Sequence, residues 1–179
     1  MINEKYIILD RDGVINHDSK SYIKTADEWK PIDRSLEAIA KLTENNFNII
    51  IITNQSGIER GLITPSEFIK INLKMISEIY NSGGQITSIL YCPSSPPSQS
   101  VFRKPNSGMF DEIASRLDLQ LTSCYSIGDS PRDIEASIKA KCMTLAVRTG
   151  NGNEIEKNNF YNVPIFDDLF EATNFIISG

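Results

Sequence analysis

Two aspartates lie two positions apart, directly after a short apolar run, in the segment LDRDG at residues 9–13. Two carboxylates at the end of a strand can take different chemical roles. Asp10 can attack a phosphorus atom as a nucleophile, and Asp12 can act as general acid and then as general base. Gly13 allows the backbone to bend so that its N–H groups face a phosphate. Taken alone this short pattern is also typical of a turn, so the prediction of phosphoryl transfer through an aspartyl-phosphate depends on further residues.

Three further residues could assist that chemistry. Asp129, in the segment IGDSPRD, would form with Asp10 a site for a hard cation, and Mg²⁺ is the natural ion beside a phosphate. Thr53 can donate a hydroxyl hydrogen bond, and Lys104 supplies a positive charge for the phosphoryl oxygens. We therefore expect in-line attack by Asp10, protonation of the leaving group by Asp12, and then attack of water on the aspartyl-phosphate with help from Asp12.

These residues need a scaffold that brings them together. Five apolar runs predict β-strands at residues 6–9, 47–53, 86–91, 124–128 and 143–147. They lack strict polar alternation, which is typical of a sheet covered on both faces. Helical periodicity lies between them, and one predicted face is marked by Ile69, Leu73, Ile76 and Tyr80. Strands that alternate with helices predict an α/β fold, a doubly wound, Rossmann-like parallel sheet.

The candidate residues follow the predicted strands at their carboxyl ends. Asp10 and Asp12 follow the first run, Thr53 ends the second, and Asp129 follows the fourth. Lys104 ends a loop just before a predicted helix. In sheets of this type ligands bind at the carboxyl ends of the strands. The acids, the hydroxyl and the lysine are therefore expected to converge on one edge.

Two residues near these motifs have a role that the sequence leaves open. Asp133 fits the first turn of a helix with Ser130 as N-cap, and it fits indirect support of the metal equally well. Trp29 lies in the long segment before the first predicted helix, and we expect it to attach that segment to the core. Neither is assigned a direct part in the chemistry.

Length and composition limit the remaining possibilities. A chain of 179 residues fits a single domain, which we place at residues 1–179. The net charge of −5 argues against nucleic-acid and membrane partners. Three widely spaced cysteines favour reduced thiols, and no apolar run approaches the roughly 18 residues of a membrane span. We expect a cytoplasmic monomer.

Four ordered motifs carry a family resemblance. The segments LDRDG, IITNQSG, RKP and IGDSPRD resemble the motifs of phosphatases of the haloacid-dehalogenase (HAD) superfamily. Over residues 5–150 the chain is similar to the D,D-heptose 1,7-bisphosphate 7-phosphatase family. The resemblance implies a HAD-like fold with a minimal cap and a small phosphorylated sugar as substrate. It implies removal of the 7-phosphate of a heptose bisphosphate, for the synthesis of nucleotide-activated heptose and lipopolysaccharide precursors.

The resemblance also assigns roles to positions. It implies that Asp10 is the nucleophile, and that Asp12 is the acid/base whose backbone carbonyl also binds Mg²⁺. Thr53 would bind the phosphate, Lys104 would steady the phosphoryl group, and Asp129 would complete the metal ligands. The candidate substrate contacts are Arg11, Asp18, Ser19, Lys20, Ser21, Tyr22, Asn54, Gln55, Ser56, Arg60, Arg103 and Ser130, the last at a position where many relatives carry lysine.

The loop before the RKP motif departs from the family pattern. Relatives usually carry Cys-x-His and then Cys-x-Cys there, a closed tetrahedral Zn²⁺ site. This chain keeps Cys92, has Ser94 in the place of the histidine, and has no cysteine between Cys92 and Arg103. We therefore expect no structural Zn²⁺. We expect three prolines to stiffen the loop by limiting its conformations in the unfolded chain: Pro93, Pro96 and Pro97.

Two alternative functions are compatible with parts of the pattern. Histidinol-phosphate phosphatases share many of the motifs, and the segment EWKPIDRSLEAI favours the heptose family over them. Receiver-type phospho-acceptor domains also combine acids, a hydroxyl and a lysine at one sheet edge. They place the acceptor on a middle strand, whereas Asp10 follows the first predicted strand with Asp12 beside it. The sequence therefore favours a phosphatase, without specifying the anomer of its sugar.

Overall fold

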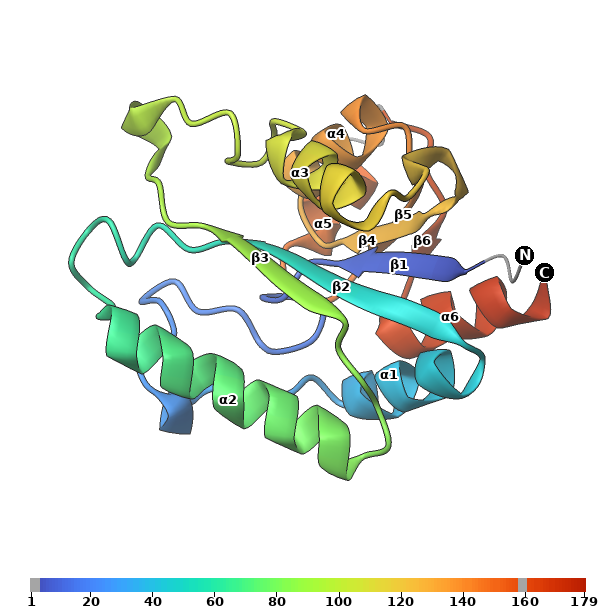
Figure 1. Ribbon diagram of the computed structural model, residues 1–179, viewed down its shortest axis with the longest axis horizontal. Coiled ribbons are helices and arrows are strands. Elements are labelled where there is room, and N and C mark those ends of the chain that lie inside the picture. The colour runs from blue at the N-terminus through green and yellow to red at the C-terminus, as the bar shows by residue number, and fades with distance from the viewer. Residues whose placement is uncertain (1–3, 158–160) are drawn as a thin grey trace.

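The structure, a computed structural model, describes residues 4–157 and 161–179. A six-stranded sheet has the order β3-β2-β1-β4-β5-β6, and every neighbouring pair is parallel (Figure 1). This topology confirms the predicted doubly wound α/β fold. The strands are β1 (Lys5–Leu9), β2 (Phe47–Asn54), β3 (Ser88–Cys92), β4 (Tyr125–Gly128), β5 (Met143–Val147) and β6 (Ile165–Phe166).

Helices cover both faces of the sheet. In Figure 1, α1, α2 and α6 lie below it, and α3, α4 and α5 lie above it. Within residues 4–157 and 161–179, no helix is long and apolar enough to span a membrane. The helices are α1 (Ser35–Glu44), α2 (Pro65–Asn81), α3 (Gly108–Leu117), α4 (Pro131–Lys139), α5 (Gly152–Lys157) and α6 (Leu169–Ser178), and the short 3-10 helices are η1 (Ala26–Glu28), η2 (Pro96–Ser98) and η3 (Leu121–Ser123).

The core explains why the strands read as continuous apolar runs. Successive side chains of a strand point to opposite faces. Ile7 and Leu9 pack with α1, α2 and α6, whereas Ile8 packs against α3 and α4. Trp29 is fully buried in the first of these clusters, as expected for a residue that attaches its loop to the core. Burying each large apolar side chain contributes about 1.5–3 kcal/mol.

The predicted element positions agree with the structure to within two residues. The run at 143–147 coincides with β5, and the run at 86–91 is displaced by two residues at its start. Thr64 caps α2 by accepting a hydrogen bond from the N–H of Glu67 at 3.2 Å, with Pro65 at the first helical position. The two-residue strand β6 was not predicted, because so short an apolar pair has no detectable period.

The predicted buried face of α2 is wrong. Ile69 and Leu73 are 57% and 60% exposed, and Ile76 and Tyr80 are also exposed. The side chains that pack against the sheet are Phe68, Ile71, Met75 and Ile79. Both stripes repeat at helical spacing, so periodicity predicted the helix correctly. Periodicity could not show which of the two apolar stripes packs against the sheet, because that depends on how the preceding loop sets the rotation of α2 about its axis.

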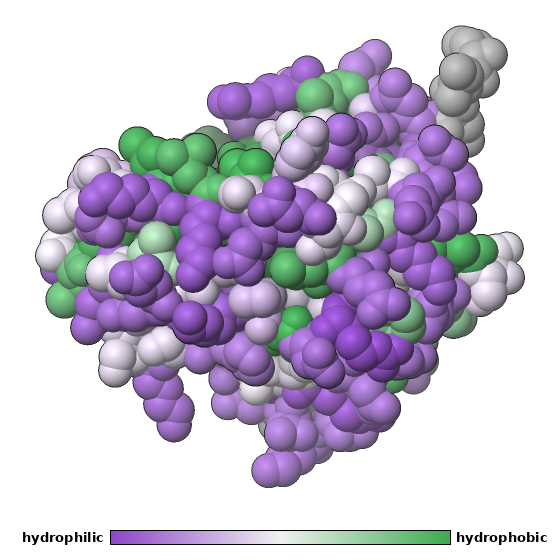
Figure 2. Space-filling view, turned by 90° about the horizontal axis from the view of Figure 1, so that it is seen from below, coloured by the Kyte–Doolittle hydropathy of each residue, from purple (hydrophilic) through white to green (hydrophobic). Residues whose placement is uncertain are grey.

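The carboxyl ends of the strands all meet at one edge. The segments that follow β1, β2 and β3 extend over this edge as loops, at residues 10–34, 55–64 and 93–107, and include the short helices η1 and η2 (Figure 1). The expected minimal cap therefore consists of loops on the sheet edge. A view of the molecule from the side of α1, α2 and α6 shows a mixed surface on which polar residues predominate (Figure 2).

Candidate active site

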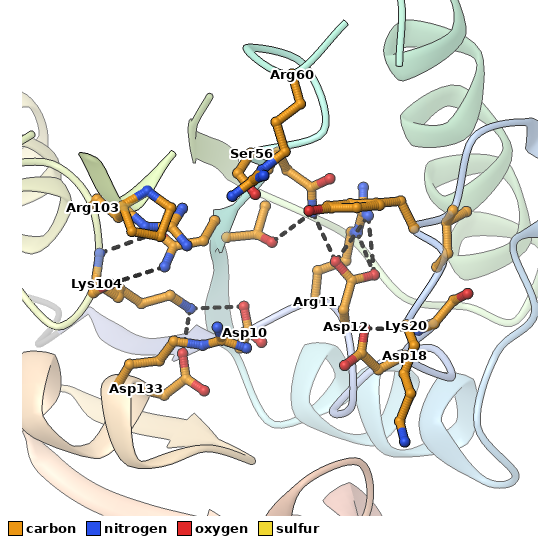
Figure 3. Close-up of a pocket in the computed structure, with 18 residues that line it drawn as sticks. Asp10, Arg11, Asp12, Asp18, Lys20, Ser56, Arg60, Arg103, Lys104 and Asp133 are labelled. Carbon is orange, nitrogen blue, oxygen red and sulfur yellow. Dashed lines mark hydrogen bonds and ion pairs between the residues drawn. The ribbon is translucent and has the colours of Figure 1, made fainter. Parts of the chain in front are cut away.

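A pocket of about 280 Å³ opens at the carboxyl ends of β1 and β2 (Figure 3). Most of the candidate site residues line it, although they come from four separate parts of the chain. Three candidates do not line the pocket: Asp129, Ser21 and Ser130. Those that do are Asp10, Arg11, Asp12, Asp18, Ser19, Lys20, Tyr22, Thr53, Asn54, Gln55, Ser56, Arg60, Arg103 and Lys104.

Lys104 is the central cation of the site. Its Nζ lies 2.7 Å from Asp10 Oδ1 and 2.6 Å from Asp133 Oδ1, and it donates to the carbonyl of Ile52 at 2.9 Å. Asn54 fixes the backbone of Lys104 through two hydrogen bonds of 3.0 and 3.1 Å. Burial opposes the charge of this lysine, but the two carboxylates outweigh burial and raise its pKa. The ammonium group is therefore held charged at the base of the pocket.

Three carboxyl groups, those of the buried Asp129 and Asp133 and the partly buried Asp10, form a candidate metal site. Asp10, Asp129 and Asp133 each offer one oxygen, and these oxygens lie within 4.8 Å of one another. Burial raises the pKa of Asp129 to about 8, and the carboxylates of Asp133 and Asp10 add to the shift. Burial likewise raises the pKa of Asp10 to about 7, although Lys104 opposes the shift. Because oxygen ligands and uncompensated negative charge suit a hard divalent cation, the residues fit Mg²⁺.

Two glycines create the space in which Asp129 lies. A Cβ atom at Gly13 or at Gly150 would lie 2.1 Å from Asp129 Oδ2. Both glycines also have a positive φ, +87° and +62°. Asn151 then donates to the same carboxylate oxygen from its backbone N–H at 2.8 Å. Gly13 was predicted to let the backbone bend, whereas Gly150 and Asn151 carried no signal in the sequence because they approach Asp129 only in the folded chain.

Asp133 caps a helix, and it also faces the candidate metal site, where its support of an ion stays a prediction. Its Oδ2 accepts hydrogen bonds from the backbone N–H of Ser130, at 3.1 Å, and from the Ser130 hydroxyl, which completes a capping box at the start of α4. Its Oδ1 faces Lys104 and the carboxyl cluster. The hydrogen bonds and the charge of Lys104 outweigh burial and lower the pKa of Asp133. Ser130 is committed to this cap.

Asp12 is held by neighbours separate from the Lys104 cluster. Its carboxylate accepts hydrogen bonds from Arg11 at 2.9 Å, from Asn16 at 2.8 Å and from Gln55 at 2.7 Å. The same Gln55 amide nitrogen donates to the hydroxyl oxygen of Thr53 at 3.0 Å. Arg11 is only 1% exposed, and its guanidinium group contacts Asp12 through Nε and Nη2. One amide group thereby links the Asp12 carboxylate to the Thr53 hydroxyl.

The mouth of the pocket carries several cations. Arg60 and Arg103 line one side, and Lys20 lies across from them beside Asp18 (Figure 3). Sequence reasoning missed Arg132, which also lines the pocket. Its place in the motif IGDSPRD, directly before Asp133, could have revealed it. Partial burial lowers the pKa of Arg103, and the charges of Arg132 and Arg60 lower it further. These positive groups favour an anionic ligand.

Comparisons with known proteins agree with this geometry. The family model described as HAD-hydrolase-like matches residues 101–172. The D-glycero-beta-D-manno-heptose-1,7-bisphosphate 7-phosphatase of Bordetella bronchiseptica is 42% identical over 150 residues, 84% of each chain. The enzyme of the same name from Pseudomonas putida is 39% identical and is matched over 92% of this chain and 95% of its own.

Solved structures of enzymes with this activity in their names also resemble this chain in fold. A crystal structure of D,D-heptose 1,7-bisphosphate phosphatase from B. bronchiseptica, complexed with magnesium and phosphate, superposes with a TM-score of 0.95 at 37% identity. It covers 97% of this chain and 98% of its own. A second structure, from Burkholderia thailandensis, has a TM-score of 0.78 at 30% identity and covers 98% and 99% of the two chains. Fold and sequence thus point to the same relatives.

Proposed function

This chain belongs to the D-glycero-β-D-manno-heptose-1,7-bisphosphate 7-phosphatase family of HAD-like phosphoric monoester hydrolases, and we propose that it removes the 7-phosphate of that bisphosphate. The observation that carries the proposal is the pocket in which Asp10, paired with Lys104, lies below a mouth lined by arginines. A sugar with two phosphates would supply one anionic group beside Asp10 and Lys104 and a second one at the arginines of the mouth. Its product would serve the synthesis of nucleotide-activated heptose and of lipopolysaccharide precursors.

The proposed reaction has two steps. A carboxylate oxygen of Asp10 attacks the phosphorus in line, the bond from phosphorus to the sugar oxygen breaks, and Asp12 gives its proton to that oxygen. A water molecule then attacks the aspartyl-phosphate, Asp12 accepts its proton, and phosphate leaves with Asp10 restored. Arg11, Asn16 and Gln55 orient Asp12 for both proton transfers.

The metal is proposed to be Mg²⁺. Asp10 and Asp129 would hold it through carboxylate oxygens and Asp12 through its backbone carbonyl, with Asp133 in the same cluster. When bound, the ion neutralises negative charge on the carboxyl cluster and on the phosphoryl group. The magnesium in the similar crystal structure supports this choice. That the loop after Cys92 carries no Zn²⁺ stays a prediction.

The remaining assignments are part of the same proposal. Lys104 and Thr53 would contact the phosphoryl group that is transferred, since both lie at the base of the pocket. The second phosphate would meet Arg60 and Arg103, and the sugar would meet the segment from Asp18 to Tyr22. We propose that residues 1–179 act as one domain. A monomeric state, a cytoplasmic location, and the absence of nucleic-acid and membrane partners stay predictions.

The test is phosphate release in the presence of Mg²⁺. The substrates are both anomers of heptose 1,7-bisphosphate, histidinol phosphate and a set of hexose phosphates. The heptose bisphosphate is expected to give the highest kcat/KM, and equal turnover of histidinol phosphate would reject the substrate assignment. Asp10→Asn should abolish turnover, while Asp167→Asn, a substitution at an exposed carboxylate that pairs with Arg148, should not. Turnover by Asp10→Asn at the rate of the parent would reject the mechanism.

A further inference from the structure

The loop that leads from β3 to Lys104 has little regular structure of its own. Between the end of β3 and the RKP motif it forms only the three-residue helix η2, Pro96–Ser98. Pro96 lines the pocket, and Arg103 and Lys104 at the end of the loop are among the cations of the site. The position of the loop therefore affects the site directly, and something other than backbone pairing must hold it.

One carboxylate contacts the first half of this loop, whereas Asn106 and Gly108 contact its second half at Ser100 and Val101. Glu59 lies in the segment 55–64, which follows β2 and also carries Arg60. Its side chain accepts hydrogen bonds from the backbone N–H of Ser95 and from the hydroxyl of Ser98, at 2.7 and 2.9 Å. The hydrogen bonds from Ser95 and Ser98 lower the pKa of Glu59 to about 2, so the group is ionised at neutral pH.

The held loop in turn supports Arg103. The Nη1 group of Arg103 donates to the carbonyl of Ser94 at 2.7 Å, one position before the residue that Glu59 binds. Among the residues that the structure describes, Arg103 and its neighbours Arg60 and Arg132 form no ion pair. A movement of Ser94 and Ser95 would therefore move a guanidinium group that is free to bind an anion.

We propose that Glu59 is a positioning residue that holds the loop 93–103 and thereby directs Arg103 to the phosphate that is not cleaved. This inference rests on the proposed function, because it needs a substrate with two phosphates. The contact acts on the binding of that second phosphate and leaves the chemistry at Asp10 unchanged. Charge-assisted hydrogen bonds of this kind are stronger than neutral ones.

The experiment compares Glu59→Ala and Glu59→Gln with a control, Glu156→Ala, which removes another exposed carboxylate that accepts two hydrogen bonds, here from Arg148. For heptose 1,7-bisphosphate, Glu59→Ala should raise KM about tenfold, the loss expected for one charge-assisted contact, while kcat stays within about twofold. For p-nitrophenyl phosphate, which has no second phosphate, both constants should be unchanged. Glu59→Gln, which keeps one acceptor oxygen, should be intermediate, and Glu156→Ala should behave as the parent.

A second readout needs no turnover. Hydrogen exchange of the peptide that covers 93–103 should become faster in Glu59→Ala and stay unchanged in Glu156→Ala. Unchanged exchange would overturn the role of Glu59 as the contact that holds the loop. An equal loss on both substrates, or an unchanged KM for the bisphosphate, would overturn its effect on Arg103. If the parent does not hydrolyse heptose bisphosphate, the proposed function fails, and the exchange measurement still decides whether Glu59 holds the loop.

Discussion

The ammonium group of Lys104 lies 2.7 Å from a carboxylate oxygen of Asp10, although 94 positions separate the two residues in the chain. Lys104 is 3% exposed and also contacts Asp133, so one cation offsets part of the charge of three clustered carboxyl groups. The pair joins the carboxyl end of β1 to the loop that follows β3. We therefore expect stability and catalysis to depend on the same contact.

Replacing Lys104 by methionine should abolish turnover and destabilise the metal-free protein. Breaking a buried ion pair by removing one partner costs about 3–5 kcal/mol, because the other charge stays buried without compensation. The matched control is Lys70→Met, which removes an exposed pair with Glu67 and should cost less than about 1 kcal/mol. Urea unfolding and phosphate release measure the two effects. Equal free energies of unfolding for the two variants would contradict the prediction.

Gly150→Ala should weaken Mg²⁺ binding by more than about tenfold, because a displaced ligand oxygen loses its contact with the ion. A Cβ at this position would lie 2.1 Å from Asp129 Oδ2, whereas a Cβ at Gly61 would meet no atom within 4 Å. Both glycines have a positive φ, so Gly61→Ala carries the same backbone strain without the collision. The Mg²⁺ dependence of activity and calorimetric titration give the affinity. Similar Mg²⁺ affinities in the two variants would show that the collision is relieved elsewhere.

In the metal-free protein, stability should fall as the pH rises from about 4 to about 8. The pKa of Asp10 is raised to about 7 and that of Asp129 to about 8, above the ordinary value of 3.8. The folded state therefore binds more protons than the unfolded state in this window, and losing them destabilises it. Mg²⁺ binds the deprotonated carboxylates, so its stabilisation should grow over the same range.

Thermal unfolding in EDTA and in Mg²⁺, at about pH 6 and about pH 8, checks this prediction. In EDTA, Tm should be lower at the higher pH, and the difference between Mg²⁺ and EDTA should be larger there. Asp129→Asn should reduce both effects, because it removes the group with the larger shift. A Tm in EDTA that rises over this interval would contradict the assignment of the shifts.

The two apolar stripes of α2 should respond differently to truncation. Met75→Ala should destabilise the protein by about 2–5 kcal/mol, because it leaves a cavity beneath the helix. Leu73→Ala, on the same helix at 60% exposure, should change stability by less than about 0.5 kcal/mol. Chemical denaturation measures both. A larger loss for Leu73→Ala would indicate that the exposed stripe is covered in solution.

The convergence of the candidate catalytic residues was predictable from the sequence alone. Apolar runs long enough for strands, with helical periods between them, specify a parallel sheet, and ligands bind at the carboxyl ends of such strands. This reasoning predicts that Asp10, Thr53 and Asp129 lie at the same edge of the sheet. The position of each of these residues is predicted from a local pattern a few residues long, and such a pattern can be recognised in the sequence alone. The motifs then narrowed the chemistry to phosphoryl transfer.

The remaining features were decided by contacts between distant segments. Three features depend on how segments are rotated and stacked in three dimensions. They are the face of α2 that packs against the sheet, the close approach of Gly150 to Asp129, and the hydrogen bond between Glu59 and Ser95, which are 36 positions apart. The sequence by itself predicted five of the six strands, the doubly wound α/β class and the residues proposed to carry the chemistry. Only the tertiary structure decided which neighbouring residues shift the pKa values of these side chains and fix their positions. Such contacts join residues far apart in the chain, and local periodicity does not encode them.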